Sequence, residues 1–83
     1  MKKVVLVISA SWCSVCGPYK QALTRAGIEF KEYDADDPTR QEFITQSGVR
    51  SLPTTMIFDE MDLWAGTVVG NNVKKVQEIL GAC

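Results

Sequence analysis

Residues 4–16, with the sequence VVLVISASWCSVC, join a short apolar run to a close pair of cysteines. The run over 4–8 is β-branched and aliphatic throughout, which is typical of a strand buried on both faces of a covered parallel sheet. Cys13 and Cys16 follow it, separated by two residues. Apolar residues recur at helical spacing from Val15 onward. The sequence therefore predicts a cysteine pair at a strand-to-helix junction.

The later elements are predicted from the same periodicities and from turn residues. Asp37 and Pro38 suit the N-cap and the first residue of a helix whose thin apolar face favours a place on the surface. The polar link over 59–62 suits an antiparallel hairpin, and Trp64 is expected in the core or on a sheet face. In chain order we expect a strand over 4–8, a helix from Val15 to a stop at Gly27, a strand over 28–33, a helix from Asp37 to about Ser47, strands over 54–58 and 63–69, and a helix from Val73.

The order β-α-β-α-β-β-α predicts one α/β domain over residues 1–83. Its first strand-helix-strand unit should be parallel and right-handed, and its last two strands should form an antiparallel pair. The predicted fold is a minimal four-stranded mixed sheet with three helices.

Composition excludes several classes of function. Nine Lys and Arg against ten Asp and Glu give a net charge of -1, with no electrostatic reason to bind nucleic acid or an anionic membrane. The absence of histidine removes Ser-His-Asp and Cys-His catalysis and Cys/His zinc fingers. The early apolar run is far shorter than the roughly 20 residues of a membrane-spanning helix and lacks the pattern of a signal peptide. We expect a cytoplasmic monomer.

The cysteines indicate redox chemistry. Three of them are too few for a secreted disulfide framework. The thiolate is the reactive form of cysteine, and the N-terminus of a helix stabilises an anion. Cys13 should therefore hold the thiolate at lower pH than Cys16. One helical turn further on, Cys16 should be more buried, within disulfide reach, and able to attack a mixed disulfide on Cys13.

Two other interpretations of the cysteine pair compete with redox chemistry. A Cys-x-x-Cys pair can be half of a zinc or iron–sulfur site, but such sites usually need four ligands and only Cys83 remains, so no metal is expected. Two buried, inert cysteines are a second alternative.

The acidic groups over 34–37 and 59–62 look like metal ligands by composition alone and are better explained as solvated turns. Cys83 could pair with a second chain or be a regulatory thiol, and an incidental role is favoured.

Two motifs at a particular separation resemble the thioredoxin superfamily. They are WCSVC at 12–16 and GVRSLPT at 48–54, and the acidic stretch over 33–38 and Gly70 extend the match along essentially the whole chain. The strand and helix that open a full thioredoxin are missing, so in size the chain is similar to glutaredoxins and other minimal members. The resemblance implies a thioredoxin-like fold.

The resemblance also implies roles for individual residues. Cys13 matches the attacking cysteine and Cys16 the resolving cysteine, so the only redox centre implied is their disulfide. Pro53 matches a cis-proline facing that disulfide, where the exposed backbone of Leu52 would pair with a substrate chain. The implied binding surface consists of Trp12, Leu52, Pro53 and Gly70.

The chain departs from the family pattern at several positions. Val7 stands where thioredoxins carry a buried aspartate, and the dipeptide Ser14-Val15 is neither the Gly-Pro of thioredoxins nor the Pro-Tyr of many glutaredoxins. Pro18 cannot donate a helical hydrogen bond to Ser14. The stretches that bind glutathione in glutaredoxins correspond here to residues 9–11, 51–52 and 69–72, which carry no charged residue.

The sequence thus predicts a dithiol–disulfide oxidoreductase that reduces protein disulfides. Its electrons would come from a thioredoxin-reductase-type donor or from glutathione. The alternatives are a glutaredoxin-type, glutathione-dependent reductase, a binding module of the same fold whose cysteines are not turned over, and a metal-bridged dimer.

Overall fold

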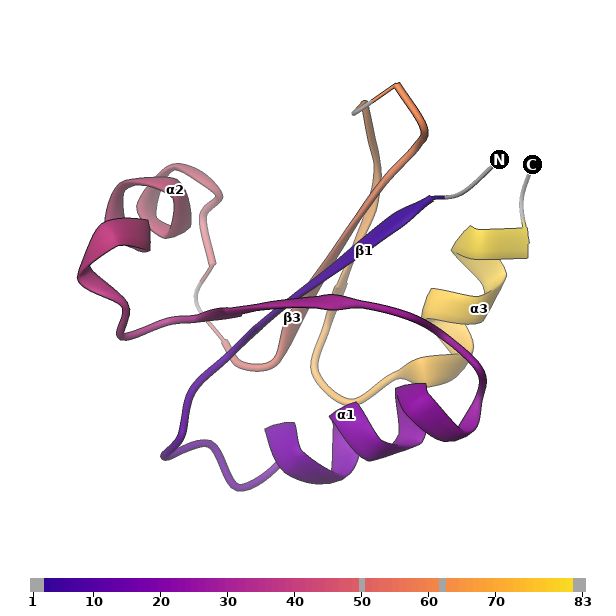
Figure 1. Cartoon of the computed structure of the whole chain (residues 1–83), viewed down its shortest axis with the longest axis horizontal. Helices are drawn as coiled ribbons and strands as arrows, with labels where there is room; N and C mark the ends of the chain where they lie inside the picture. The colour runs from indigo at the N-terminus through magenta and orange to yellow at the C-terminus, as the bar shows by residue number, and fades with distance from the viewer. Residues whose placement is uncertain (1–2, 50, 62, 82–83) are drawn as a thin grey trace.

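The computed structural model describes residues 3–49, 51–61 and 63–81. The predicted order of elements is confirmed, with a short 3₁₀ turn added before the second helix (Figure 1). The elements are β1 (Val4–Ser9), α1 (Cys16–Arg25), β2 (Lys31–Asp34), the 3₁₀ turn η1 (Pro38–Arg40), α2 (Gln41–Gln46), β3 (Thr54–Phe58), β4 (Trp64–Val69) and α3 (Val73–Gly81).

The four strands form one mixed sheet in the order β2-β1-β3-β4. β1 pairs in parallel with β2 and antiparallel with β3, and β3 pairs antiparallel with β4. Strand β1 is therefore flanked on both edges, and it is buried from Val5 to Ser9. This explains why its sequence is a continuous apolar run.

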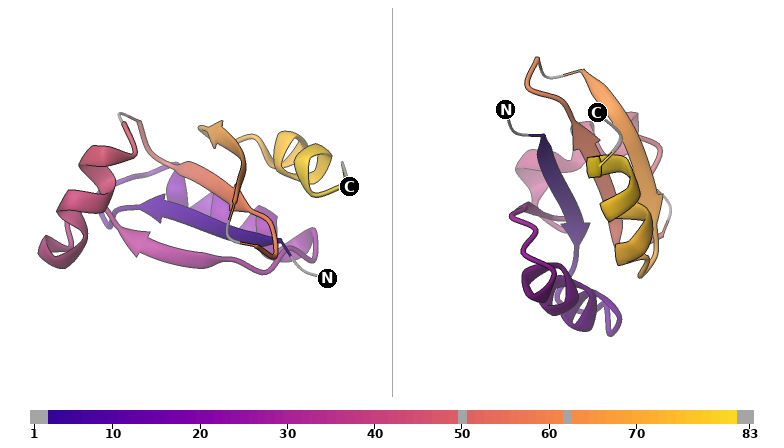
Figure 2. Two further views of the ribbon diagram at one scale, coloured as in Figure 1. Left: turned by 90° about the horizontal axis from the view of Figure 1, so that it is seen from above. Right: turned by 90° about the vertical axis from the view of Figure 1, so that its right-hand side faces the viewer.

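The helices cover the two faces of the sheet unequally (Figure 2). Helices α1 and α3 pack on one face, where the core is formed by Val5, Val7, Tyr19, Leu23, Ile57, Val68 and Val76. Helix α3 packs closely against β4. A Cβ added to Gly66 of β4 would lie only 2.8 Å from Cδ1 of Ile79 on α3. On the opposite face, Phe43 of α2 meets the ring of Tyr33 edge to face, with centroids 5.6 Å apart. Helix α2 has no buried residue, which confirms its predicted surface position.

The second strand and the second helix begin differently from the prediction. The second strand begins at Lys31, where pairing with Leu6 starts, whereas Ile28 and Phe30 only pack against the core on the way to it. The helix predicted from Asp37 begins as expected, with the carboxylate accepting a bond from the Thr39 backbone N–H, but its first turn is 3₁₀.

The edge strand β4 carries Trp64, whose side chain is 65% exposed. Its indole N–H donates to Oγ1 of Thr67 at 2.9 Å. Of the two predicted places for this residue, the sheet face is therefore right and the core is wrong. The strand WAGTVV has no charged residue along its length.

A buried polar pair joins α1 to β3. The hydroxyl of Tyr19 is hydrogen-bonded to Oγ1 of Thr55, and both residues are fully buried. Burial raises the pKa of Tyr19 above its ordinary value, and the bond to Thr55 lowers it by less. The phenol is therefore neutral at physiological pH.

Replacing Tyr19 by Phe should cost about 1–3 kcal/mol of unfolding free energy, because Thr55 is left buried without its partner. Adding Thr55→Val should recover most of that loss, since both polar groups are then removed together. Urea unfolding followed by tryptophan fluorescence measures both variants. Tyr33→Phe, at a half-buried position, is the control, and a loss no larger than the control's contradicts the expectation.

Candidate active site

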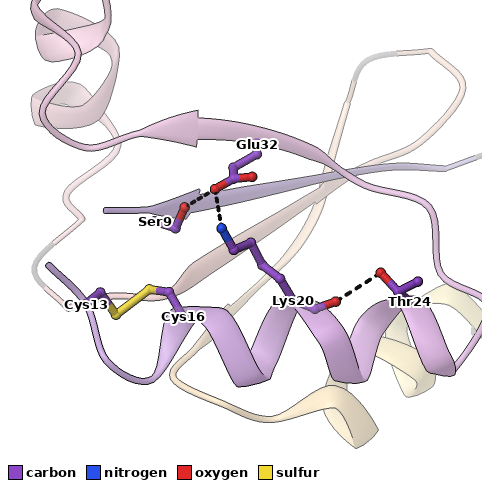
Figure 3. Close-up of polar contacts among 6 residues, drawn as sticks. All are labelled: Ser9, Cys13, Cys16, Lys20, Thr24 and Glu32. Atoms are coloured by element: carbon purple, nitrogen blue, oxygen red, sulfur yellow. Dashed lines mark hydrogen bonds and ion pairs between the residues drawn. A yellow bond between two sulfur atoms is a disulfide. The ribbon is translucent and has the colours of Figure 1, made fainter. Parts of the chain in front are cut away.

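The cysteine pair lies at the junction of β1 and α1, as predicted. Strand β1 ends at Ser9, a turn follows in which the N–H of Cys13 donates to the carbonyl of Ala10 at 3.1 Å, and Cys16 is the first residue of α1. Cys13 and Cys16 form a disulfide with their Cα atoms 5.5 Å apart (Figure 3). The prediction that the two sulfurs lie within reach of each other is confirmed.

The two cysteines differ in exposure. Cys16 is 1% exposed, whereas Cys13 is only partly buried. Trp12 and Val15 flank the pair, and their side chains are 67% and 44% exposed. A partner molecule can therefore reach Cys13 across an apolar surface but cannot reach Cys16 directly.

The N-terminus of α1 is left without a side-chain cap. Val15 occupies the N-cap position and makes no side-chain capping bond, and the first turn holds no acidic residue. The N–H of Tyr19 donates to the carbonyl of Val15 at 3.1 Å, so the helical ladder continues directly after Pro18. The positive end of the helix dipole is therefore not neutralised locally and can stabilise an anionic sulfur.

Trp12 is held in place by the acidic turn. Its indole N–H donates to Oδ2 of Asp36 at 2.6 Å, and the N–H of Asp36 donates to Oδ1 of Asp34 at 2.8 Å. The sequence interpretation treated these aspartates as a solvated turn and missed their contact with the cysteine loop. No short-range pattern shows it, because Trp12 and Asp36 are 24 residues apart.

The predicted binding residues after the cysteines converge on the same end of the sheet. Ile8 pairs with Thr54, and Thr54 pairs with Val69, so the loop before β3 and the loop after β4 both lie where β1 ends. Pro53 directly precedes Thr54, and Gly70 directly follows Val69. The strand register thus brings these two residues to the edge that carries the cysteine loop.

Pro53 and Gly70 are also bonded to each other. The N–H of Gly70 donates to the carbonyl of Pro53 at 2.8 Å, and Gly70 has a φ of 82°, which a side chain rarely allows. The bond between Leu52 and Pro53 is cis, as the resemblance implied. Pro53 is buried and Leu52 is partly buried.

A cluster of three polar side chains lies beside the first turns of α1 (Figure 3). Oε2 of Glu32 accepts one bond from the hydroxyl of Ser9 and one from the ammonium of Lys20, each at 2.6 Å. The bond from Lys20, and then the bond from Ser9, lower the pKa of Glu32 below its ordinary value, against an opposing effect of burial. The sequence interpretation missed this cluster, and the only signal for it was the helical spacing of Lys20 from Cys16.

The position that the resemblance matches to the buried aspartate of thioredoxins is occupied here by an apolar residue. Val7 is fully buried in the core formed with Tyr19 and Leu23. Its register partner on the neighbouring strand β2 is Glu32. A carboxylate is thus present on this face of the sheet, but it comes from a different strand and reaches the surface.

Within residues 3–49, 51–61 and 63–81, no three His, Cys, Asp or Glu side chains gather as a metal-ligand group. No helix in those ranges has the length and apolar character needed to cross a membrane. Cys83 lies outside the described residues, so its predicted role stays a prediction.

The structure resembles solved thioredoxins over nearly its whole length. The short form of spinach chloroplast thioredoxin f has a TM-score of 0.84 and 24% identity, covering 98% of this chain and 75% of that one. Fasciola hepatica thioredoxin has a TM-score of 0.79 and 20% identity, with 95% and 78% covered. Oxidised mitochondrial thioredoxin 3 of Saccharomyces cerevisiae has a TM-score of 0.76 and 21% identity, with 98% and 78% covered. No sequence match to a curated protein was found.

The glutaredoxin-family match, the fold and the paired cysteines together define a thiol–disulfide oxidoreductase of the thioredoxin superfamily. Residues 4–61, well over half of the chain, match the glutaredoxin family. The chain therefore belongs to the glutaredoxin family.

Glu32 should make stability depend on pH. The pKa of Glu32 is lower in the folded protein than its ordinary value of 4.5. The ionised carboxylate therefore stabilises the fold fully above pH 4.5, and this stabilisation is lost as the pH falls through the lowered pKa. The difference in unfolding free energy between the wild type and Glu32→Gln should therefore be largest above about pH 5 and shrink towards pH 3. Urea unfolding at a series of pH values measures it. Glu42→Gln on α2 is the control. The expectation is contradicted if the unfolding free energies of both variants, relative to the wild type, depend equally on pH.

Proposed function

We propose that Cys13 is the nucleophile and Cys16 the resolving thiol of an enzyme that reduces disulfide bonds in proteins. The observation that carries this proposal is the difference in exposure between the two bonded cysteines, 1% for Cys16 against a partly exposed Cys13. A sulfur that a large substrate must touch has to be accessible, and a sulfur that only attacks its neighbour does not.

The reaction proceeds by two exchanges. The Cys13 thiolate attacks one sulfur of the substrate disulfide, a mixed disulfide forms, and the released substrate thiolate takes up a proton. The Cys16 thiol then loses its proton and attacks the sulfur of Cys13. The Cys13–Cys16 bond forms, the mixed disulfide breaks, and the second substrate sulfur leaves as a thiolate and is protonated. The substrate gains two electrons and two protons, and the enzyme is left oxidised.

Features of the surface around the disulfide favour a protein substrate. Trp12 and Val15 present exposed apolar area beside Cys13, which suits contact with another protein. Leu52 lies in the loop that the strand register brings to the same edge. Its backbone would pair with an extended substrate segment, while Pro53 and Gly70 would form the floor beneath that segment.

The electron donor is proposed to be a thioredoxin-reductase-type enzyme. Membership of the glutaredoxin family favours glutathione instead. Against glutathione stands the absence of any charged residue over 9–11, 51–52 and 69–72, where glutaredoxins place the partners of that peptide. We further propose that the protein acts as a cytoplasmic monomer with no other cofactor, and without nucleic acid or membrane partners.

Cys13→Ser should abolish the reduction of insulin disulfides, because no accessible thiolate remains to attack. Cys16→Ser should instead accumulate a mixed disulfide, which non-reducing electrophoresis and mass spectrometry detect, because the second exchange is blocked. Cys83→Ser is the matched control and should keep the activity. Full activity in Cys13→Ser would rule out the proposed role. Wild-type protein that is inactive, with a Cys13 pKa near that of a free thiol, would favour the binding module.

The donor assignment is tested by supplying the oxidised protein with either reductant. A bacterial thioredoxin reductase with NADPH should reduce the Cys13–Cys16 disulfide faster than glutathione with glutathione reductase does. Oxidation of NADPH, followed by absorbance, measures both. A known dithiol glutaredoxin is the control for the glutathione arm, and turnover with glutathione as fast as that control's would reverse the assignment.

A further inference from the structure

An ion pair lies about one helical turn from the resolving cysteine. Cys16 and Lys20 are four residues apart on α1, so their side chains lie on the same face of the helix with Cβ atoms roughly 6 Å apart. The ammonium of Lys20 contacts Oε2 of Glu32 at 2.6 Å. Figure 3 shows the Lys20 side chain rising from α1 towards Glu32 and Ser9, with the disulfide at the N-terminal end of the same helix.

Three elements hold this pair in one place. Ser9, at the end of β1, is 2% exposed and donates its hydroxyl to the same carboxylate oxygen that accepts from Lys20. Glu32 comes from β2 and Lys20 from α1. The side chains of Lys20 and Glu32 are 31% and 43% exposed, so solvent screens the pair only in part. Its two charges therefore have fixed positions relative to the first turn of α1.

Each charge has an opposite effect on a neighbouring thiol. A nearby ammonium favours the thiolate and lowers the pKa of the thiol, whereas a nearby carboxylate disfavours the thiolate and raises it. Because Lys20 and Glu32 are bonded, their effects on Cys16 largely cancel. Loss of either charge would leave the other uncompensated.

We propose that Lys20 and Glu32, fixed by Ser9, are positioning residues that act on Cys16 as a balanced pair of charges, so that neither charge alone shifts the reduction potential of the dithiol. The inference rests on the redox function proposed for Cys13 and Cys16. Lys20 promotes the thiolate needed for the second exchange, and Glu32 prevents Cys16 from becoming as acidic as Cys13.

Other charged and titratable groups around Cys16 do not replace the pair. Asp34 lies on the same side of the sheet, opposite Ser9 in the β1–β2 register, and accepts a bond from the N–H of Asp36. Tyr19 of α1 is buried, neutral and bonded to Thr55 of β3. Within the part of the chain that the structure describes, neither group bonds to Lys20 or Glu32.

The first test isolates the Cys16 thiol. In a Cys13→Ser, Cys83→Ser background Cys16 is the only thiol, and its pKa follows from the ultraviolet absorbance of the thiolate against pH. Glu32→Gln should lower that pKa and Lys20→Met should raise it, each by about 0.3–1 unit, and the double variant should lie between them. Ser9→Ala should move the pKa in the direction of Glu32→Gln, by less, because the carboxylate is then less firmly held.

The second test uses the intact dithiol, with only Cys83 replaced. In a glutathione redox buffer held at a pH above the Cys16 pKa found in the first test, so that Cys16 is ionised in the reduced protein, Glu32→Gln should make the pair more oxidising and Lys20→Met more reducing, because the reduced form is stabilised by whatever stabilises the thiolate. Each equilibrium constant should change about two- to fivefold. Arg25→Met, at the far end of α1, and Glu78→Gln on α3 make the same changes of net charge at a distance and are the controls.

Shifts of the Cys16 pKa and of the dithiol equilibrium in opposite directions in the two single variants support the inference. If the ion pair only stabilised the fold, both variants would be less stable but their pKa values would not change in opposite directions. Shifts in the same direction, or shifts no larger than those of the controls, overturn it. Neither readout uses turnover, so the outcomes separate from those of the proposed function. If the wild type fails to reduce insulin while the two single variants still shift the pKa in opposite directions, the proposed function is refuted and the inference on the ion pair is not.

Discussion

The burial of β1 in the middle of the sheet is the constraint on which the site depends. Because β2 and β3 pair with both of its edges, the point at which β1 ends is fixed. Helix α1 must start within a few residues of that point and return across the same face to bury Tyr19 and Leu23. The cysteine loop is the short connection between these two rigid elements, and its sulfurs have little freedom to move apart.

The same constraint explains how distant residues come to serve one site. The strand register places the ends of β1, β2 and β4 and the beginning of β3 at one edge of the sheet. The acidic turn after β2 therefore meets Trp12, and the loop before β3 meets Gly70. The site is built from four connections, each short and each determined by where a strand begins or ends.

The sequence was sufficient for the fold and for the position of the cysteine pair at the strand-to-helix junction. The apolar run over 4–8, the cysteine spacing and the turn residues each act over a few positions, so they can be interpreted locally. The start of β2 was misplaced because Ile28 and Phe30 are apolar for packing and not for pairing. The contacts Trp12–Asp36 and Lys20–Glu32 were missed because they join separate elements, and only the parallel pairing of β1 with β2 brings their partners together.

Val7 has a consequence for how the protein carries charge through its redox cycle. The core between the sheet and α1 contains Val7 and the neutral phenol of Tyr19, and the carboxylate of Glu32 is already ionised at neutral pH. Protons that accompany the two electrons therefore go to the sulfurs themselves. Apart from Cys16 itself, the described core therefore contains no group that has to gain or lose a charge when the dithiol is oxidised or reduced, and no further buried charge has to be desolvated.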